Sequence, residues 1–251
     1  MHEIIERQFP YDKNKNILNN IDSEQRIYRI FSLSRFEEMI QNQELVLVRP
    51  SMWDDPFENL LISSKFTMKD GVEIDFASRD SVYGQCWTWH RESDAMWRIY
   101  SQFKDGIRVQ STPRKLLNAL HAQIGEFAGV RGFIGQVQYQ STAQLLQSFQ
   151  DIDLLNTSGR GIAESLLYKR RAFSHEKEIR LIYFGNDGQC DGNLFPVSIN
   201  PNEMFDTLLF DPRMDDCLRA AYKRQIKHMA CNVCFKKSKL YSPPEKLTFS
   251  F

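Results

Sequence analysis

Hydrophobic and polar residues alternate in the segment 26–31, whose sequence is Arg-Ile-Tyr-Arg-Ile-Phe. A period of two predicts a β-strand, and it places Arg29 on the same face as apolar neighbours. Ser34 and Glu37 follow with the spacing of a capping box. They predict that a helix starts at Ser34 and ends near residue 42.

The same two periods divide the rest of the chain into strands and helices. Predicted strands cover 45–48, 83–89, 107–109, 133–139, 176–184, 194–199, 207–210 and 233–235, and predicted helices cover 93–103, 112–124, 143–149, 161–173 and 214–226. The turn 185–188, Gly-Asn-Asp-Gly, is expected to turn the strand 176–184 back into the strand 194–199.

Strands and helices intermix without the regular rhythm of βαβ units. Neither GxGxxG nor the P-loop motif GxxxxGKS/T occurs, so neither a Rossmann fold nor a P-loop protein is indicated. The sequence therefore predicts an α+β fold with mixed, largely antiparallel sheets and packed helices. We expect a single domain, 1–251, with a polar N-terminal arm at 1–25.

Charges are balanced, with 32 basic and 32 acidic side chains, so a general role in coating nucleic acids or membranes is not indicated. The run 168–171, Tyr-Lys-Arg-Arg, and the pair Lys236-Lys237 are candidates for local phosphate binding, although most such runs are solvated faces. The N-terminal segment lacks the apolar core of a signal peptide, and no run approaches the roughly 18 apolar residues of a membrane helix. We therefore expect a cytoplasmic protein.

The chain has five cysteines, an odd number that favours reduced thiols over a disulfide framework. Cys231 and Cys234 have CxxC spacing, but a zinc site needs four ligands, and the sequence has no second CxxC and no HxxxH. We therefore expect no metal and interpret the pair as small hydrophobic residues next to an apolar strand.

Glu176, Glu178 and Arg180 form the most specific local feature of the sequence. On a strand with a period of two, all three side chains fall on one face, where charges are costly to bury unless they pair or serve a site. Two carboxylates beside a guanidinium satisfy either condition. A functional site and an ion-pair ladder on a half-exposed sheet face, worth little to stability, both stay open.

Two further segments are rich in aromatic side chains. In 53–58, Trp-Asp-Asp-Pro-Phe-Glu, Pro56 fixes a turn that holds carboxylates beside aromatic rings. We favour a structural role for this turn, with Trp53 and Phe57 anchored in the core and the acids accepting hydrogen bonds from backbone amides. The aromatic residues of 87–100 are of the kind that stacks on a flat ring such as nicotinamide, although a core position is the default expectation.

Several of these pieces together resemble a bacterial family catalogued only as a domain of unknown function. The resemblance spans about 27–238 and is specific as a set. Its pieces are Tyr28-Arg29-Ile30 before a capped helix, the turn Asp55-Pro56-Phe57-Glu58, Met96-Trp97-x-x-Tyr100 followed by Gly106, Lys169 before Phe173, and Glu176-x-Glu178-x-Arg180. Because the family label names no reaction, an expectation of function has to come from a second resemblance.

The order of parts is similar to that of ADP-ribosyltransferases, which have an Arg or His on the first strand, an aromatic or hydroxyl-bearing second motif and a catalytic Glu on a later strand. The resemblance implies an ADP-ribosyltransferase-like fold in which Arg29 holds a phosphate or ribose of NAD+ and Glu178 is the catalytic carboxylate. A fixed carboxylate suits this chemistry, because loss of nicotinamide leaves a positively charged ribose. Glu176 is expected to help deprotonate the acceptor. The other expected NAD+ contacts are Tyr28, Trp87, Trp89 and Arg180, with 86–89 lining the nicotinamide pocket.

The leading hypothesis is an NAD-dependent ADP-ribosyltransferase, in the setting of a toxin or phage-defence effector that modifies a nucleic acid or a protein. NAD is expected as a co-substrate, with no metal and no membrane partner. Two alternatives stay open. One is an NAD glycohydrolase that uses the same residues with water as the acceptor, and the other is a non-catalytic module that binds a nucleotide or nucleic acid through its aromatic residues and the run 169–171.

Overall fold

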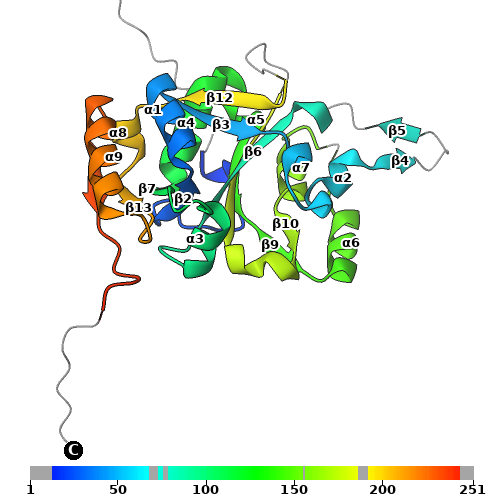
Figure 1. Cartoon of the computed structure of the whole chain (residues 1–251). Coiled ribbons are helices and arrows are strands. Elements are labelled where there is room, and N and C mark those ends of the chain that lie inside the picture. Colours follow the sequence, from blue (N-terminus) through cyan, green and yellow to red (C-terminus); the bar gives the residue numbers. More distant parts are fainter. Residues whose placement is uncertain (1–12, 68–72, 76–78, 155, 186–191, 244–251) are drawn as a thin grey trace, which may run out of the picture.

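The computed structural model describes residues 13–67, 73–75, 79–154, 156–185 and 192–243, with a large β-sheet at its centre (Figure 1). Within these residues the sheet has the order β1 (Ile17–Leu18), β8 (Gly132–Gln136), β11 (Glu178–Phe184), β6 (Val82–Thr88), β2 (Ile27–Phe31), β7 (Ile107–Ser111), β13 (Thr207–Phe210) and β14 (Cys234–Lys236). β3 (Glu44–Val48) pairs with both β6 and β12 (Leu194–Ser198). The pairings are antiparallel except β1 with β8 and β13 with β14. The predicted α+β class with a largely antiparallel sheet is confirmed.

β11 lies in the middle of the sheet and is buried on both faces. Its residues at 179, 181 and 183 face the larger hydrophobic core, to which the helices α1 (Leu33–Asn42) and α4 (Pro113–Ile124) contribute their apolar faces. Glu178 and Arg180 alternate with these residues, and they share the opposite face with Ile182, which belongs to the smaller core. The charged residues of the motif therefore enter the interior on the side of the smaller core.

The sheet opens between β2 and β6. These two strands share one register pair, Tyr28 with Thr88. Beyond that pair, β2 continues along β7 while β6 continues along β11. Arg29 Nη1 crosses the opening and donates a hydrogen bond to the carbonyl oxygen of Cys86. Elsewhere in the sheet such a carbonyl oxygen accepts its hydrogen bond from the backbone of a neighbouring strand, whereas here it accepts one from a side chain.

Most of the predicted elements are confirmed, but α1 begins earlier than expected. Its N-cap is Ser32 and not Ser34, and the Ser32 side chain accepts a hydrogen bond from the Arg35 amide. Ser32 has the extended backbone that an N-cap requires, whereas Ser34 already lies within the helix. Two serines lie close to the start of this helix, and the backbone conformation decides that Ser32 is the cap.

The predicted helix 161–173 is wrong in its second half. α7 (Arg160–Ser165) is followed by β10 (Tyr168–Arg170), which pairs with β9 (Gln138–Gln140), and by the 3-10 helix η6 (Arg171–Glu176). Leu166 and Leu167 belong to the smaller core, and tertiary packing overrides the helical spacing here. The strand predicted at 176–184 begins at Glu178, because Lys177 has left-handed backbone (φ 44°) that leaves Glu176 in η6.

Two further expectations differ from the structure. β12 pairs with β3 and not with β11, and residues 186–188 of the expected turn lie outside the described residues. Part of the expected N-terminal arm joins the sheet as β1, where Asn16 Nδ2 donates to the Gly132 carbonyl oxygen at 2.8 Å. No helix of the described part of the chain is long and apolar enough to cross a membrane.

The remaining elements lie outside the large sheet and are short, apart from α9 with its 13 residues (Figure 1). They are η1 (Lys13–Asn16), η2 (Pro50–Met52), η3 (Pro56–Asn59), α2 (Leu60–Ser63), β4 (Lys65–Thr67), β5 (Glu73–Asp75), η4 (Arg79–Ser81), α3 (Asp94–Tyr100), η5 (Gly125–Phe127), α5 (Ala128–Arg131), α6 (Thr142–Gln150), α8 (Pro201–Met204) and α9 (Asp216–His228). Of these, η3 and α3 matter most for the site, because each contributes a side chain to it.

Candidate functional site

A buried cluster of five charged side chains lies beside the opening of the sheet. The Lys169 ammonium group lies 2.5 Å from both Glu176 Oε2 and Glu178 Oε1, and 3.0 Å from Glu58 Oε1. Arg180 Nε lies 2.7 Å from Glu178 Oε2, and Arg180 Nη2 pairs with Glu58 Oε2. All five residues are between 0 and 7% exposed. The motif therefore does not form an ion-pair ladder on a half-exposed sheet face.

Elements far apart in the sequence bring these charges together. Glu58 comes from η3, Lys169 from β10 and Glu176 from the end of η6, while β11 supplies the other two. Arg180 is enclosed further by the Leu166 carbonyl oxygen, which accepts its hydrogen bond at 2.7 Å, and by the Trp53 ring, 4.4 Å away. A guanidinium that is buried so completely is tolerated because its donors are paired.

Asp55 fixes the turn that carries Glu58. Its side chain caps η3 by accepting a hydrogen bond from the Phe57 amide at 3.1 Å, as the sequence predicted for the acids of this turn. Its carboxylate also binds Arg170 through two hydrogen bonds, of 2.9 and 3.1 Å. Two residues of the run 169–171 are therefore not part of a solvated face: Lys169 is buried against Glu58 of η3, and Arg170 is paired with Asp55 just before it, whereas Arg171 is exposed.

The two carboxylates of the motif differ in pKa. Burial raises the pKa of Glu178, but the charges of Arg180 and Lys169 outweigh it and hold the pKa well below its usual value. Burial, followed by the hydrogen bond and charge of Glu178, raises the pKa of Glu176 to about 7. Near neutral pH, Glu178 is thus a fixed anion and Glu176 is able to exchange a proton.

Arg29 is a half-buried cation without a counter-ion among the described residues. Its guanidinium lies over the Phe31 ring at 5.0 Å, its Nη1 binds the Cys86 carbonyl, and its Nε has no hydrogen-bond partner. Burial lowers the pKa of Arg29, yet a guanidinium keeps its charge in proteins. An unsatisfied, desolvated guanidinium is a receptor for an anion.

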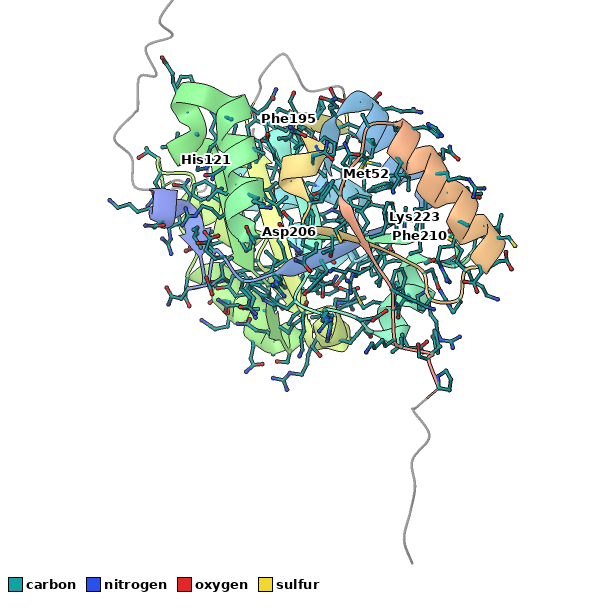
Figure 2. The ribbon with its side chains drawn as sticks, turned by 90° about the vertical axis from the view of Figure 1, so that its left-hand side faces the viewer. Met52, His121, Phe195, Asp206, Phe210 and Lys223 are labelled. Carbon is teal, nitrogen blue, oxygen red and sulfur yellow. The ribbon has the colours of Figure 1, made fainter. Side chains whose placement is uncertain are left out.

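Three adjoining cavities meet at Arg29. A narrow one of about 60 Å³ reaches inward past Tyr100 to Glu176 and Glu178. A second, of about 250 Å³, is lined by four of the five residues of the charged cluster, all except Arg180, and a third, of about 260 Å³, extends over β3 toward α1. Met52, labelled in Figure 2, lines both of the wider cavities. Since Arg29 borders all three, they form one cleft, which we call the carboxylate cleft.

Most of the predicted site residues lie on the carboxylate cleft. Those that line it are Tyr28, Arg29, Trp87, Glu176 and Glu178. The indole of Trp87 is also part of the larger core and donates to Gln85 Oε1 at 2.8 Å. Trp89 packs against the larger core and Arg180 is enclosed behind Glu178, so neither lines the three cavities.

Sequence reasoning missed Glu58, Lys169 and Tyr100 as parts of the site. Tyr100 Oη donates to Glu176 Oε1 at 3.3 Å, and burial raises the pKa of this phenol. No periodicity connects Glu58 with Lys169, which lie on segments far apart in the chain. The one available signal was that all three residues occur within the pieces that carry the resemblance to the family of unknown function.

A larger cavity of about 640 Å³ lies away from this cleft, between α9 and β14. The rings of Phe210 and Phe235 stack at 5.3 Å, and Lys223 lies over Phe235 at 5.4 Å. Figure 2 shows Phe210 and Lys223 together on this side of the molecule. Lys236 and Lys237, the second basic candidate, line it as exposed side chains. The carboxylate cleft, with its buried charges, is the stronger candidate for chemistry.

The cysteine pair at the end of the chain differs in exposure, since Cys231 is buried and Cys234 exposed, and both are free. Among the residues that the structure describes, no group of three or more His, Cys, Asp or Glu side chains is arranged to hold a metal ion. The candidate site is therefore built from the carboxylate cleft alone.

Comparisons with known proteins found similar solved structures but no similar sequence family. No model of a protein family matches the chain, and no curated protein matches it. The resemblance to the family of unknown function thus stays a prediction.

Solved structures of Thermus sp. 2.9 DarT are similar to this chain at 12% sequence identity, covering 86% of it. The complex with carba-NAD+ has a TM-score of 0.37, the complex with NAD+ 0.36 and the complex with ADP-ribosylated ssDNA 0.37. The match covers 96, 96 and 95% of those chains, respectively. Because these scores are low, any assignment of function has to rest on the geometry of the carboxylate cleft.

Proposed function

We propose that this chain is an ADP-ribosyltransferase with NAD+ as its co-substrate. The charge pattern of the carboxylate cleft carries the proposal: the unpaired Arg29 adjoins a cluster in which three carboxylates outnumber two cations. NAD+ has the complementary pattern, an anionic pyrophosphate joined through one ribose to a cationic nicotinamide ring. A guanidinium suits the pyrophosphate because its planar fork matches phosphate oxygens.

In the proposed reaction, the bond between ribose C1′ and the nicotinamide nitrogen breaks, and its electron pair leaves with neutral nicotinamide. The positive charge that remains on the ribose is stabilised by Glu178, which stays ionised because of its cationic neighbours. The acceptor forms the new bond to C1′ and passes its proton to Glu176, whose pKa of about 7 suits a general base. The products are the ADP-ribosylated acceptor, nicotinamide and one proton.

The aromatic residues have unequal roles in this proposal. Tyr28 and Trp87 line the narrow end of the cleft beside the two carboxylates, where the nicotinamide ring would lie. Tyr100 borders the same space, and its side chain has to give way, because the cavity is narrow. Arg180 acts on Glu178 and not on NAD+, and Trp89 has no part in the proposal because it packs against the core.

The wide end of the cleft suits the adenosine half of NAD+. Val46, Met52 and Leu194 line it with partly exposed apolar surface. Asn42, whose amide can donate to and accept from a purine, lines the same cavity. Arg29 lies between this end and the carboxylates, the place that a pyrophosphate occupies between adenosine and nicotinamide riboside.

The acceptor is proposed to be a nucleic acid or a protein, as for a toxin or phage-defence effector. NAD+ labelled in its adenosine half, incubated with the protein and separate pools of single-stranded DNA, RNA and protein, tests the proposal. Label transferred to one pool supports it. Nicotinamide release without a labelled acceptor indicates an NAD glycohydrolase, which uses the same chemistry with water. Unchanged NAD+ in every pool contradicts an enzymatic function.

A further inference from the structure

Lys169 occupies the centre of the buried cluster. Its ammonium group contacts one carboxylate from each of three elements, η3, η6 and β11, at 2.5 to 3.0 Å. The Phe173 ring lies 4.7 Å from the same nitrogen and covers it further. Because the residue is 6% exposed, its charge is little screened by solvent and acts strongly on all three carboxylates.

The contacts of Lys169 also distinguish the two oxygens of Glu176. Lys169 binds Oε2, whereas Oε1 accepts the hydrogen bond from Tyr100 on the cavity side. Glu58 binds the same ammonium with Oε1 and pairs with Arg180 through Oε2. Glu58 therefore offsets part of the positive charge that Lys169 presents to Glu176 and Glu178.

We propose that Lys169 is a positioning residue for the transfer reaction, and that Glu58 adjusts how strongly it acts on the acceptor-activating Glu176. The proposal rests on the proposed function, because it takes Glu176 as the group that receives the acceptor's proton. Lys169 holds Glu176 Oε2 in place and leaves Oε1 as the oxygen that receives the proton. It also opposes protonation of Glu176 near neutral pH, while Glu58 favours it.

The surroundings of Glu176 determine the sign of each effect. The titratable and charged groups that contact it are Lys169 on β10, Glu178 on β11 and Tyr100 on α3. Those that share its cavities are Glu58 on η3, Cys86 on β6, Tyr28 and Arg29 on β2, and Asp54 and Asp55 before η3. Burial and Glu178 raise the pKa of Glu176, and Lys169 lowers it. Removal of the Lys169 charge should therefore raise this pKa, and removal of the Glu58 charge should lower it.

The test uses two substitutions of opposite sign, Lys169→Met and Glu58→Gln. The pKa of Glu176 is measured by NMR titration of its side-chain carboxyl carbon, whose signal is assigned with Glu176→Gln. The pH dependence of kcat is measured with NAD+ and the acceptor that the labelling experiment identifies. We expect both midpoints to rise by roughly one pH unit or more in Lys169→Met and to fall in Glu58→Gln. Lys169→Arg keeps the charge, so both of its midpoints should stay near those of the wild type. Arg171→Met removes an exposed cation two residues away and is the matched control.

Damage to the fold alone would not move the two midpoints in opposite directions. The proposal is overturned if an active wild type gives midpoints that move together, or not at all, in the two variants. It is also overturned if the NMR midpoint moves while the kcat profile does not. If Lys169→Met fails to fold, two variants still test the proposal: Glu58→Gln should lower both pH midpoints, and Lys169→Arg should leave them near those of the wild type. A wild type that consumes no NAD+ contradicts the proposed function instead. The NMR titration does not depend on activity, so it distinguishes failure of the proposed function from failure of the Lys169 proposal.

Discussion

Arg29 and Glu178 differ in how their charges are satisfied. Arg29 has no counter-ion among the described residues, and one of its donors is unpaired. Glu178 is held by both Lys169 and Arg180. A half-buried cation without a counter-ion is stabilised when a ligand supplies an anion, whereas a doubly paired carboxylate stays ionised and fixed throughout a reaction cycle.

Substitution of Arg29 tests the anion site. Arg29→Lys keeps the charge but loses the planar fork, so NAD+ binding should weaken by about 1 to 3 kcal/mol while the fold survives. Calorimetric titration of NAD+ measures the change. Arg108 is the control, because its Nε is likewise buried without a hydrogen-bond partner but the residue lies outside the lining of the three cavities. Equal losses in Arg29→Lys and Arg108→Lys would argue against a phosphate contact by Arg29.

Substitution of Glu178 tests the catalytic carboxylate. Glu178→Gln keeps the shape but removes the charge, so turnover of NAD+ should fall by about a hundredfold or more while NAD+ affinity changes far less. The variant also leaves Lys169 and Arg180 with less compensating charge, so its melting temperature has to be measured beside its rate. Glu126→Gln, an exposed carboxylate, is the control. An active, folded Glu178→Gln protein would remove Glu178 from the mechanism.

Among the elements, η3 and β10 form the wall that holds the charged cluster. Asp55, the N-cap of η3, and Glu58 within it meet Arg170 and Lys169 on β10, so two acidic residues face two adjacent basic ones. Asp55 both caps its own short helix and binds across to β10. The position of Glu58 in the cluster therefore depends on contacts that Asp55 makes.

Loss of Asp55 tests this coupling between elements. Asp55→Ala removes a cap and a bidentate ion pair with a half-buried Arg170, so unfolding free energy should fall by about 1 to 3 kcal/mol. Turnover should fall as well, because Glu58 loses its anchor. Denaturant unfolding and NAD+ turnover measure the two effects. Glu164→Ala breaks an exposed i,i+4 pair with Arg160 and should cost at most about 0.5 kcal/mol. Full turnover in Asp55→Ala would show that η3 is not coupled to the site.

The same elements show where sequence patterns predict structure and where they fail. Strands β2, β3 and β7 and helices α1 and α4 were predicted closely from their local sequence patterns, although β7 is buried along its whole length. The segment 161–173 was predicted as one helix, yet it divides into α7, β10 and η6. Its local pattern is compatible with a helix, and only pairing with β9 and burial of Lys169 against η3 select the strand.

At the scale of the whole molecule, the carboxylate cleft exists because β2 and β6 part after a single register pair. The half of the sheet with β7 and β13 carries Arg29, and the half with β11 and β8 carries Glu178. A ligand that contacts both Arg29 and Glu178 therefore connects the two halves.

This arrangement predicts that NAD+ stabilises the protein across the sheet opening. At a concentration of one hundred times Kd, a ligand that binds only the folded state adds about 2.7 kcal/mol to the unfolding free energy, so the melting temperature should rise with NAD+. Hydrogen exchange should slow in both β2 and β6, and Arg29→Lys should need more NAD+ for the same rise. Protection confined to the cavity between α9 and β14 would place the binding site there instead.

The sequence by itself determined the α+β class and most strands and helices, predicted the cap made by the acids of the turn 53–58, and indicated Arg29 and the Glu-x-Glu-x-Arg motif as candidates for a site. These follow from local periods and from the cost of placing charge on an apolar strand, both of which act between near neighbours in the chain. Only the tertiary structure decided that Glu58 and Lys169 join the motif, that Glu176 lies off the strand and that the sheet opens beside Arg29. The physical reason is that ion pairs and strand pairing depend on distances in space, and contacts between segments so far apart leave no period in the sequence.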